Sequence, residues 1–279
     1  MSALDWRELA LADRQREYSP SSRVGDLAPY LARYRSASER VRARREVIRY
    51  GPGAEQVVVL FPGATPQAPL HVFFHGGYWQ ELSVADSLFA ADGFSERGLA
   101  FATVGYELAP AITLGEIVKD CRLAFRCLLA EAGVEPRRVV VSGSSAGAHL
   151  AAMVALAPGT EPPPPIDAAV LVSGIYELEP LLGTTINDAL ALDARSARAL
   201  SPQLMAPAAR PSVSIFVGDN ETGQFKRQSS RYAEHLRAHG VPVVEHEIEG
   251  RNHFDVVLDL AEAGTILGDH ALRLASSDG

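Results

Sequence analysis

The stretch GSSAG at residues 143–147 places Ser145 between two glycines. A run of β-branched residues precedes it and a helix-prone run follows, so the pattern predicts a strand that turns sharply into a helix. In such a G-x-S-x-G turn, Gly143 and Gly147 let strand and helix approach closely, and the corner projects the serine hydroxyl into open space. Small residues also cluster in ordinary turns, so a plain turn serine is the alternative. The context favours a nucleophile at Ser145.

A serine hydroxyl is a weak nucleophile at neutral pH, so catalysis also needs donors for the negative oxygen that develops on the substrate. The strand expected at residues 70–74 runs into two successive glycines, whose backbone N–H groups carry no side chains beside them. A tight turn is the alternative for these glycines taken alone. We predict that the N–H groups of Gly76, Gly77 and Ala146 form an oxyanion hole. Tyr78 and Trp79 come next and are predicted to line the substrate cleft.

The base is predicted to be His253, because it lies in a loop after the last expected strand. This position fits the chain order serine, acid, histidine that is found around a G-x-S-x-G turn. The acid that orients the base is expected in residues 218–221, directly after the preceding strand. Asp219 and Glu221 both qualify, and composition and spacing do not choose between them.

These motifs resemble one known family, the arylformamidase (kynurenine formamidase) branch of the α/β-hydrolase serine esterases. The resemblance rests on HGGYW, GSSAG and HFD, on SGIYELEPL at residues 173–181, on GDNETGQFKRQS at 218–229 and on YSPSSRV at 18–24. It implies a serine hydrolase without a cofactor. It also implies that the acid is Glu221, which stands where the family commonly has aspartate.

Three functions are carried forward as hypotheses. The first is a hydrolase that cleaves an N-formyl arylamide such as N-formylkynurenine, or a small acyl ester, through an acyl-enzyme intermediate. The second is a carboxylesterase for small alcohol or aryl esters, which would use the same residues. The third, from another class, is a non-catalytic protein of the same fold that binds a small ligand.

The elements expected to position these residues alternate between strands and helices, which indicates a mostly parallel sheet with helices on both faces. The eight expected strands are residues 46–50, 57–61, 70–74, 100–104, 139–141, 168–172, 213–217 and 243–248. The expected helices are residues 86–97, 112–132, 146–157, 225–239 and 255–263. We therefore expect a single α/β-hydrolase domain over residues 1–279, with a helical N-terminal lead at 1–45 and a cap-like insertion at 176–211.

The net charge of −8 argues against a nucleic-acid partner, which would need a concentrated positive surface. No apolar run is long enough to span a bilayer, and the N-terminus has no apolar signal core, so a cytoplasmic location without membrane attachment is expected. No cluster of Cys and His has the spacing of metal ligands, so no metal site is predicted. The expected partner is a small acyl or formyl substrate, and a homodimer is left open.

Overall fold

A computed structural model describes residues 4–131, 133–156, 158 and 163–276 of the chain. Within these residues all eight predicted strands are present, and they form one sheet in the order β1-β2-β4-β3-β5-β6-β7-β8. The strands are β1 Glu46–Arg49, β2 Val57–Phe61, β3 Leu70–Phe74, β4 Ala100–Val104, β5 Val139–Ser144, β6 Ala168–Val172, β7 Ser212–Asn220 and β8 Val243–Asn252. The predicted α/β-hydrolase fold is thus confirmed at the level of the sheet.

Strands β3 to β8 are parallel to one another, whereas β1–β2 and β2–β4 are antiparallel pairs. Parallel neighbours require crossover connections, which here contain helices. These helices cover both faces, so the central strands are buried at every residue. This explains why the central strands are continuous apolar runs rather than alternating ones. The carboxyl ends of the parallel strands meet at one edge, where the predicted site residues lie.

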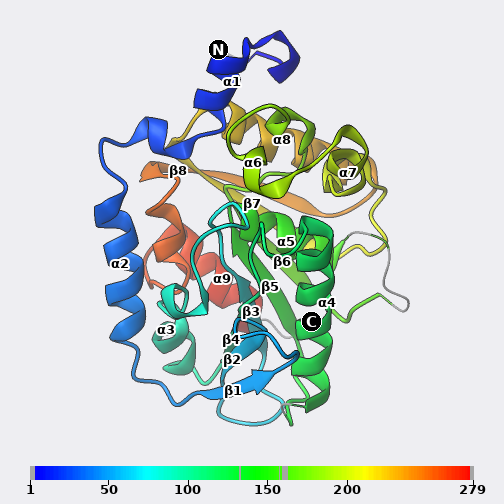
Figure 1. The fold of residues 1–279 in the computed structure, drawn as a ribbon. Coiled ribbons are helices and arrows are strands. Elements are labelled where there is room, and N and C mark those ends of the chain that lie inside the picture. The colour runs from blue at the N-terminus through cyan, green and yellow to red at the C-terminus, as the bar shows by residue number, and fades with distance from the viewer. Residues whose placement is uncertain (1–3, 132, 157, 159–162, 277–279) are drawn as a thin grey trace.

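Helices lie in a layer on each side of the sheet (Figure 1). The helices of the described residues are α1 Leu11–Glu17, α2 Ala28–Glu39, α3 Ala91–Ser95, α4 Leu114–Glu131, α5 Ala146–Ala155, α6 Asn187–Leu190, α7 Ala194–Ala199, α8 Gly223–Ala238 and α9 Ile266–Ser276. Apolar residues of α4, α5 and α8 form one core with one face of the sheet, and those of α3 and α9 form a second core with the other face. The two cores hold the sheet, and with it the strand ends, in place.

Two expected helices differ from the structure. Residues 86–97 form a 3₁₀ turn at Val84–Asp86 and the short helix α3, because residues 87–90 between them are held by other contacts, such as the Ser38 hydroxyl that accepts from the Leu88 N–H. Residues 255–263 form only the 3₁₀ turn Val256–Asp259. Helix α9, which was not predicted, comes after this turn. The expected ends of two further helices, at residues 132 and 157, lie outside the described residues.

The N-terminal lead contains α1 and α2 with a 3₁₀ turn at Pro20–Arg23 between them, and it runs along one side of the molecule (Figure 1). The segment 176–211 contains α6, α7 and the 3₁₀ turns Glu179–Leu181 and Pro202–Leu204. Both segments reach the sheet edge at which β5, β6, β7 and β8 end. No helix of the described residues has the length and apolar character that crossing a membrane requires.

Candidate active site

Ser145 occupies a strained turn between β5 and α5. Its backbone has φ 56° and ψ −120°, a left-handed conformation that non-glycine residues rarely adopt. Two close approaches hold it there. A Cβ atom on Gly143 would lie 2.1 Å from the Gly147 carbonyl oxygen, and one on Gly147 would lie 2.0 Å from the Phe74 carbonyl oxygen. The Ser145 N–H also donates to the Val172 carbonyl of β6 at 2.8 Å. Strain that is retained so firmly is typical of functional turns.

His253 and Glu221 are in direct contact. The His253 Nδ1 atom lies 2.7 Å from Glu221 Oε2, and both residues are buried. Glu221 follows β7 and His253 follows β8, and these two strands are parallel neighbours, so their carboxyl ends bring the side chains together. Because a carboxylate only accepts hydrogen bonds, Nδ1 carries the proton and Nε2 is the ring nitrogen that can take up another.

The second carboxylate oxygen of Glu221 is also bound. Oε1 accepts from the Ser173 hydroxyl at 2.5 Å and from the Gly218 N–H at 2.8 Å. Ser173 directly follows β6, is fully buried, and has a positive φ of 51°. The sequence analysis assigned Ser173 no role, although SGIYELEPL was among the motifs of the resemblance. A small polar residue at a strand end beside the other site residues was the signal for it.

Asp219, the other candidate acid, does not contact His253. Its Oδ1 atom is buried and accepts no hydrogen bond within the described residues. The register of β7 against β8 is irregular between Gly218 and Asn220, so strand alternation does not tell which carboxylate faces the histidine. The structure places Glu221 there.

The backbone of Gly76 and Gly77 lies against the Ser145 turn. A Cβ atom on Gly76 would lie 2.9 Å from the Ser144 carbonyl oxygen, and Gly77 has a positive φ of 95°. Ala146 is the first residue of α5, where N–H groups have no intrahelical acceptor. Within the described residues, the N–H groups of Gly76, Gly77 and Ala146 donate to no backbone carbonyl. These three donors are therefore available to a negatively charged oxygen.

His75 stabilises the glycine turn. Its ring stacks on Tyr106 with centroids 4.1 Å apart, and its Nδ1–H donates to the Gly76 carbonyl at 2.9 Å. Burial lowers the pKa of His75 to about 4, so the ring is neutral at neutral pH. It holds the loop and adds no positive charge to the site.

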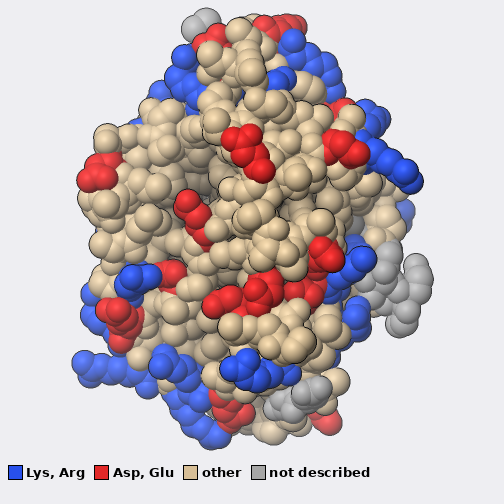
Figure 2. Space-filling model, in the orientation of Figure 1, with Lys and Arg blue, Asp and Glu red and all other residues tan. Residues whose placement is uncertain are grey.

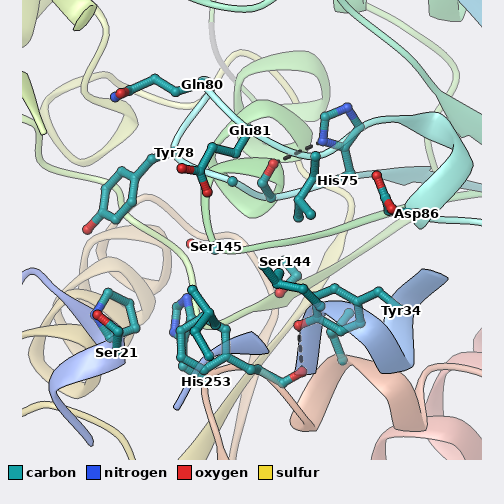
Figure 3. A pocket seen from close by; sticks show the side chains of 18 of the residues that line it. Ser21, Tyr34, His75, Tyr78, Gln80, Glu81, Asp86, Ser144, Ser145 and His253 are labelled. Carbon is teal, nitrogen blue, oxygen red and sulfur yellow. Dashed lines mark hydrogen bonds between the residues drawn. The ribbon is translucent and has the colours of Figure 1, made fainter. Parts of the chain in front are cut away.

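A cavity of about 330 Å³ opens beside Ser145 and His253 (Figure 3). Residues from five separate segments line it: Gln15, Ser19, Pro20, Ser21, Leu27, Leu31 and Tyr34; Phe73, His75, Gly76, Gly77, Tyr78, Gln80, Glu81, Leu82, Asp86, Ser87 and Phe89; Ser144 and Ser145; Thr185 and Ile186; and His253, Phe254 and Val257. The volume suits a ligand about the size of one substituted aromatic ring. In the space-filling view the same face of the molecule is hollowed (Figure 2).

Tyr78 lines the cavity as predicted, and its hydroxyl donates to the Tyr18 carbonyl at 2.5 Å. Trp79 does not. It is fully buried, and its ring packs edge-on against His149 with centroids 5.0 Å apart. Tyr78 and Trp79 both have a positive φ, and this backbone directs their side chains apart. Burial in the core stabilises the large apolar ring of Trp79 more than a place at the cavity would. The expectation that Trp79 contacts substrate is therefore corrected.

The N-terminal lead supplies cavity wall that the sequence analysis did not foresee. Leu27, Leu31 and Tyr34 contribute apolar surface, and the Tyr34 hydroxyl donates to the Phe254 carbonyl beside the histidine loop at 2.5 Å. The YSPSSRV stretch was noted only for its resemblance. Within the described residues, no three His, Cys, Asp or Glu side chains are grouped as metal ligands would be.

Comparisons with known proteins agree with this geometry. A family model described as alpha/beta hydrolase fold matches residues 71–256. The chain is 30% identical to the kynurenine formamidase of Danio rerio, over 97% of this chain and 98% of the relative. It belongs to the arylformamidase-like α/β hydrolases. A kynurenine formamidase of Salmo salar is 29% identical, over 96% of this chain and 98% of the relative.

This arylformamidase-like hydrolase is also similar to a solved structure, a putative thioesterase from a Silicibacter species. The TM-score is 0.80 at 27% identity, and the match covers 94% of this chain and 98% of that chain. Family and fold together identify the protein as an enzyme, a serine hydrolase of the formamidase or esterase type. These relatives support an enzyme rather than the hypothesis of a non-catalytic binding protein.

Proposed function

We propose that this arylformamidase-like hydrolase removes a formyl or other short acyl group from an aromatic amine, as in N-formylkynurenine. The observation that carries the proposal is the 2.7 Å contact between His253 Nδ1 and Glu221, made at the cavity that Ser145 also lines. A serine and a histidine that line one cavity, with a carboxylate buried against the histidine, are the groups that acyl transfer needs.

In the proposed mechanism Ser145 Oγ attacks the substrate carbonyl carbon and gives its proton to His253 Nε2. The carbonyl oxygen becomes negative and accepts hydrogen bonds from the N–H groups of Gly76, Gly77 and Ala146. His253 then protonates the departing nitrogen as its bond to carbon breaks. Water then attacks the carbonyl carbon of the acyl-serine as His253 takes its proton, and His253 returns that proton to Ser145 Oγ as the acyl–oxygen bond breaks and the acid leaves.

Glu221 keeps the imidazole in the tautomer with Nδ1–H and stabilises the imidazolium that forms in each step. Its two oxygens are both engaged, one with His253 and one with Ser173 and Gly218. This leaves the carboxylate little freedom to rotate. The proposed acid is therefore held in one orientation by its neighbours.

The cavity supports a small aromatic substrate. Its volume of about 330 Å³ and the rings of Tyr34, Phe73, Tyr78 and Phe254 suit a flat apolar group. A long acyl chain would extend beyond the cavity into water and gain nothing from its extra methylenes. The relatives named kynurenine formamidase support a formylated arylamine as the substrate.

Hydrolysis of a small aryl ester or thioester is the second candidate function. The similarity to a putative thioesterase favours it, and the same residues would perform it. The alcohol of an ester is a better leaving group than the amine of an amide. An enzyme whose natural substrate is an amide can therefore also hydrolyse an ester.

The test compares the rate constants kcat/KM for N-formylkynurenine and for p-nitrophenyl esters from acetyl to decanoyl. We expect turnover of the formamide and of acetyl ester, and falling rates with longer acyl chains. Ser145→Ala should lower kcat by about 10⁶-fold while the circular dichroism spectrum stays unchanged. Near-normal turnover by Ser145→Ala would overturn both candidate functions, and a rate that rises steadily to decanoyl would overturn the small-substrate assignment.

A single domain over the whole chain, with the lead 1–45 and the cap-like insertion 176–211, stays a prediction, as do a cytoplasmic location and a homodimer. Limited proteolysis, cell fractionation and sedimentation are the measurements that check them.

A further inference from the structure

The fixed charges that line the cavity are acidic. Glu81 and Asp86 are among its lining residues. None of the described residues that line the cavity is a Lys or an Arg. Figure 2 shows acidic side chains at the hollow, with Lys and Arg side chains further out on this face. The whole chain carries a net charge of −8, so the surrounding field has the same sign. Such a cavity attracts cations and repels anions.

Asp86 has partners within the protein. Its Oδ2 atom accepts from the Ser83 hydroxyl at 2.8 Å, and its Oδ1 atom lies 3.4 Å from Arg35 Nε. The arginine offsets much of the charge of this carboxylate. Asp86 is therefore the weaker candidate for binding a ligand.

Glu81 differs from Asp86 on this point. No hydrogen bond or ion pair links its carboxylate to any side chain among the described residues, and Figure 3 shows it directed into the pocket on the side of Tyr78 and Ser145. Its backbone is fixed, because its N–H donates to the Gly77 carbonyl at 2.9 Å. The backbone of Glu81 is thus held beside Gly77, one of the proposed oxyanion donors, and its exposed carboxylate is available to a ligand.

We propose that Glu81 pairs with a positively charged group of the substrate, such as a primary ammonium group, so that the cavity favours substrates with that group over neutral substrates and over those whose only charge is a carboxylate. The inference rests on the proposed function of the cavity and adds the charge of the substrate to it. The aromatic side chains of Tyr78 and Phe254, which also line the cavity, support it, since aromatic rings attract cations.

The kinetic test uses three phenyl acetates that differ at the para position. One carries an aminomethyl group, one an ethyl group of nearly the same shape, and one a carboxylate. The ratio of kcat/KM between the cationic and the neutral ester should fall about fivefold in Glu81→Gln, as expected for loss of one partly exposed ion pair. Comparing ratios within each variant removes the differences in leaving-group reactivity.

Two controls separate Glu81 from the general field of the protein. Glu234 is an exposed acid on α8 that does not line the cavity, and Glu234→Gln should leave the ratio unchanged. Glu81→Lys should favour the carboxylate ester instead. Raising the salt concentration from about 0.05 M to about 0.5 M should reduce the wild-type preference, because exposed charges are screened. If Glu234→Gln and Glu81→Gln change the ratio equally, the site at Glu81 is refuted.

Binding to the inactive Ser145→Ala variant tests the inference without catalysis. Calorimetry should show that benzylammonium binds more tightly than benzyl alcohol or benzoate, and that adding Glu81→Gln removes this preference. An unchanged preference overturns the inference while the proposed function stands. If hydrolysis proves independent of Ser145, the proposed function fails, and the binding result alone then decides the role of Glu81.

Discussion

The side of the cavity that carries Ser145, Glu221 and His253 is built from strand ends, and its backbone is packed so closely that only glycine fits at Gly143 and Gly147. Another wall of the cavity is built from the N-terminal lead and lies beside the histidine loop. It is attached through side chains, as where the Tyr34 hydroxyl donates to the Phe254 carbonyl. Many of its lining residues are half-buried or exposed, whereas the three site residues are buried.

This contrast suggests a division of tasks. Backbone packing positions atoms to within tenths of an ångström, which the proposed chemistry needs. Side-chain attachment tolerates substitution, which suits a surface that determines what is bound. Changes on the strand side should therefore act on kcat, and changes on the wall should act on KM or on stability.

After that of Ser145→Ala, the largest expected effect is that of Glu221→Gln on the strand side. Without the carboxylate, His253 can adopt the wrong tautomer, and kcat should fall by up to about 10⁴-fold. Asp219→Asn is the matched control, since Asp219 does not contact His253, and kcat should stay within about twofold. Steady-state kinetics on one acyl substrate checks both. The reverse order of losses would make Asp219 the orienting acid.

The second prediction concerns His149, which lies on α5 directly behind Ser145. Burial lowers its pKa to about 4 in the folded protein, against an ordinary value of 6.5. Between these pH values the unfolded chain binds the proton and the folded chain does not, so the free energy of unfolding falls as the pH is lowered. The contribution of His149 reaches about 2 kcal/mol near pH 5 and is absent near neutral pH.

Urea unfolding of His149→Gln near pH 7 and near pH 5 measures this contribution. Glutamine keeps a donor for the Leu200 carbonyl, which the imidazole binds at 2.8 Å. The difference between the two pH values should shrink by about 2 kcal/mol relative to wild type. His239→Gln, at an exposed position, should leave it unchanged. An equal difference in His149→Gln and wild type would contradict the prediction.

Ser173→Ala should have a smaller effect on the strand side. It removes the hydroxyl that holds Glu221 Oε1, and kcat should fall about tenfold with little change in KM, because one hydrogen bond to a charged group is lost. Ser229→Ala is the matched control, since the Ser229 hydroxyl is buried without a hydrogen-bond partner among the described residues. Equal losses in kcat for both variants would assign Ser173 a merely structural role.

The smallest expected effect is on the wall. Tyr34→Phe should lower the free energy of unfolding by about 1 kcal/mol and raise KM about threefold, because the Phe254 carbonyl loses its donor. Tyr50→Phe loses a similar hydrogen bond, to the Gly105 carbonyl, far from the cavity. It should lose similar stability at unchanged KM. If both variants shift KM alike, the wall does not contribute to binding in the proposed way.

The strands and the Ser145 turn could be predicted from the sequence because their signals are local. Runs such as residues 70–74 are apolar and β-branched or aromatic over the length of a strand, and the paired glycines around Ser145 mark a turn that only close backbone packing requires. Helix α9 was missed although its apolar residues recur at helical spacing, and it packs them into the second core.

The sequence by itself determined the order of strands and helices along the chain and the motifs at the strand ends, since these depend on neighbouring residues. Only the tertiary structure decided that Glu221 rather than Asp219 contacts His253, that Trp79 lies in the core, and that the N-terminal lead forms a wall of the cavity. These outcomes depend on contacts between segments far apart in the chain. The position of each of these side chains depends on how the layers of helices and strands pack together. A local sequence pattern carries no information about that packing.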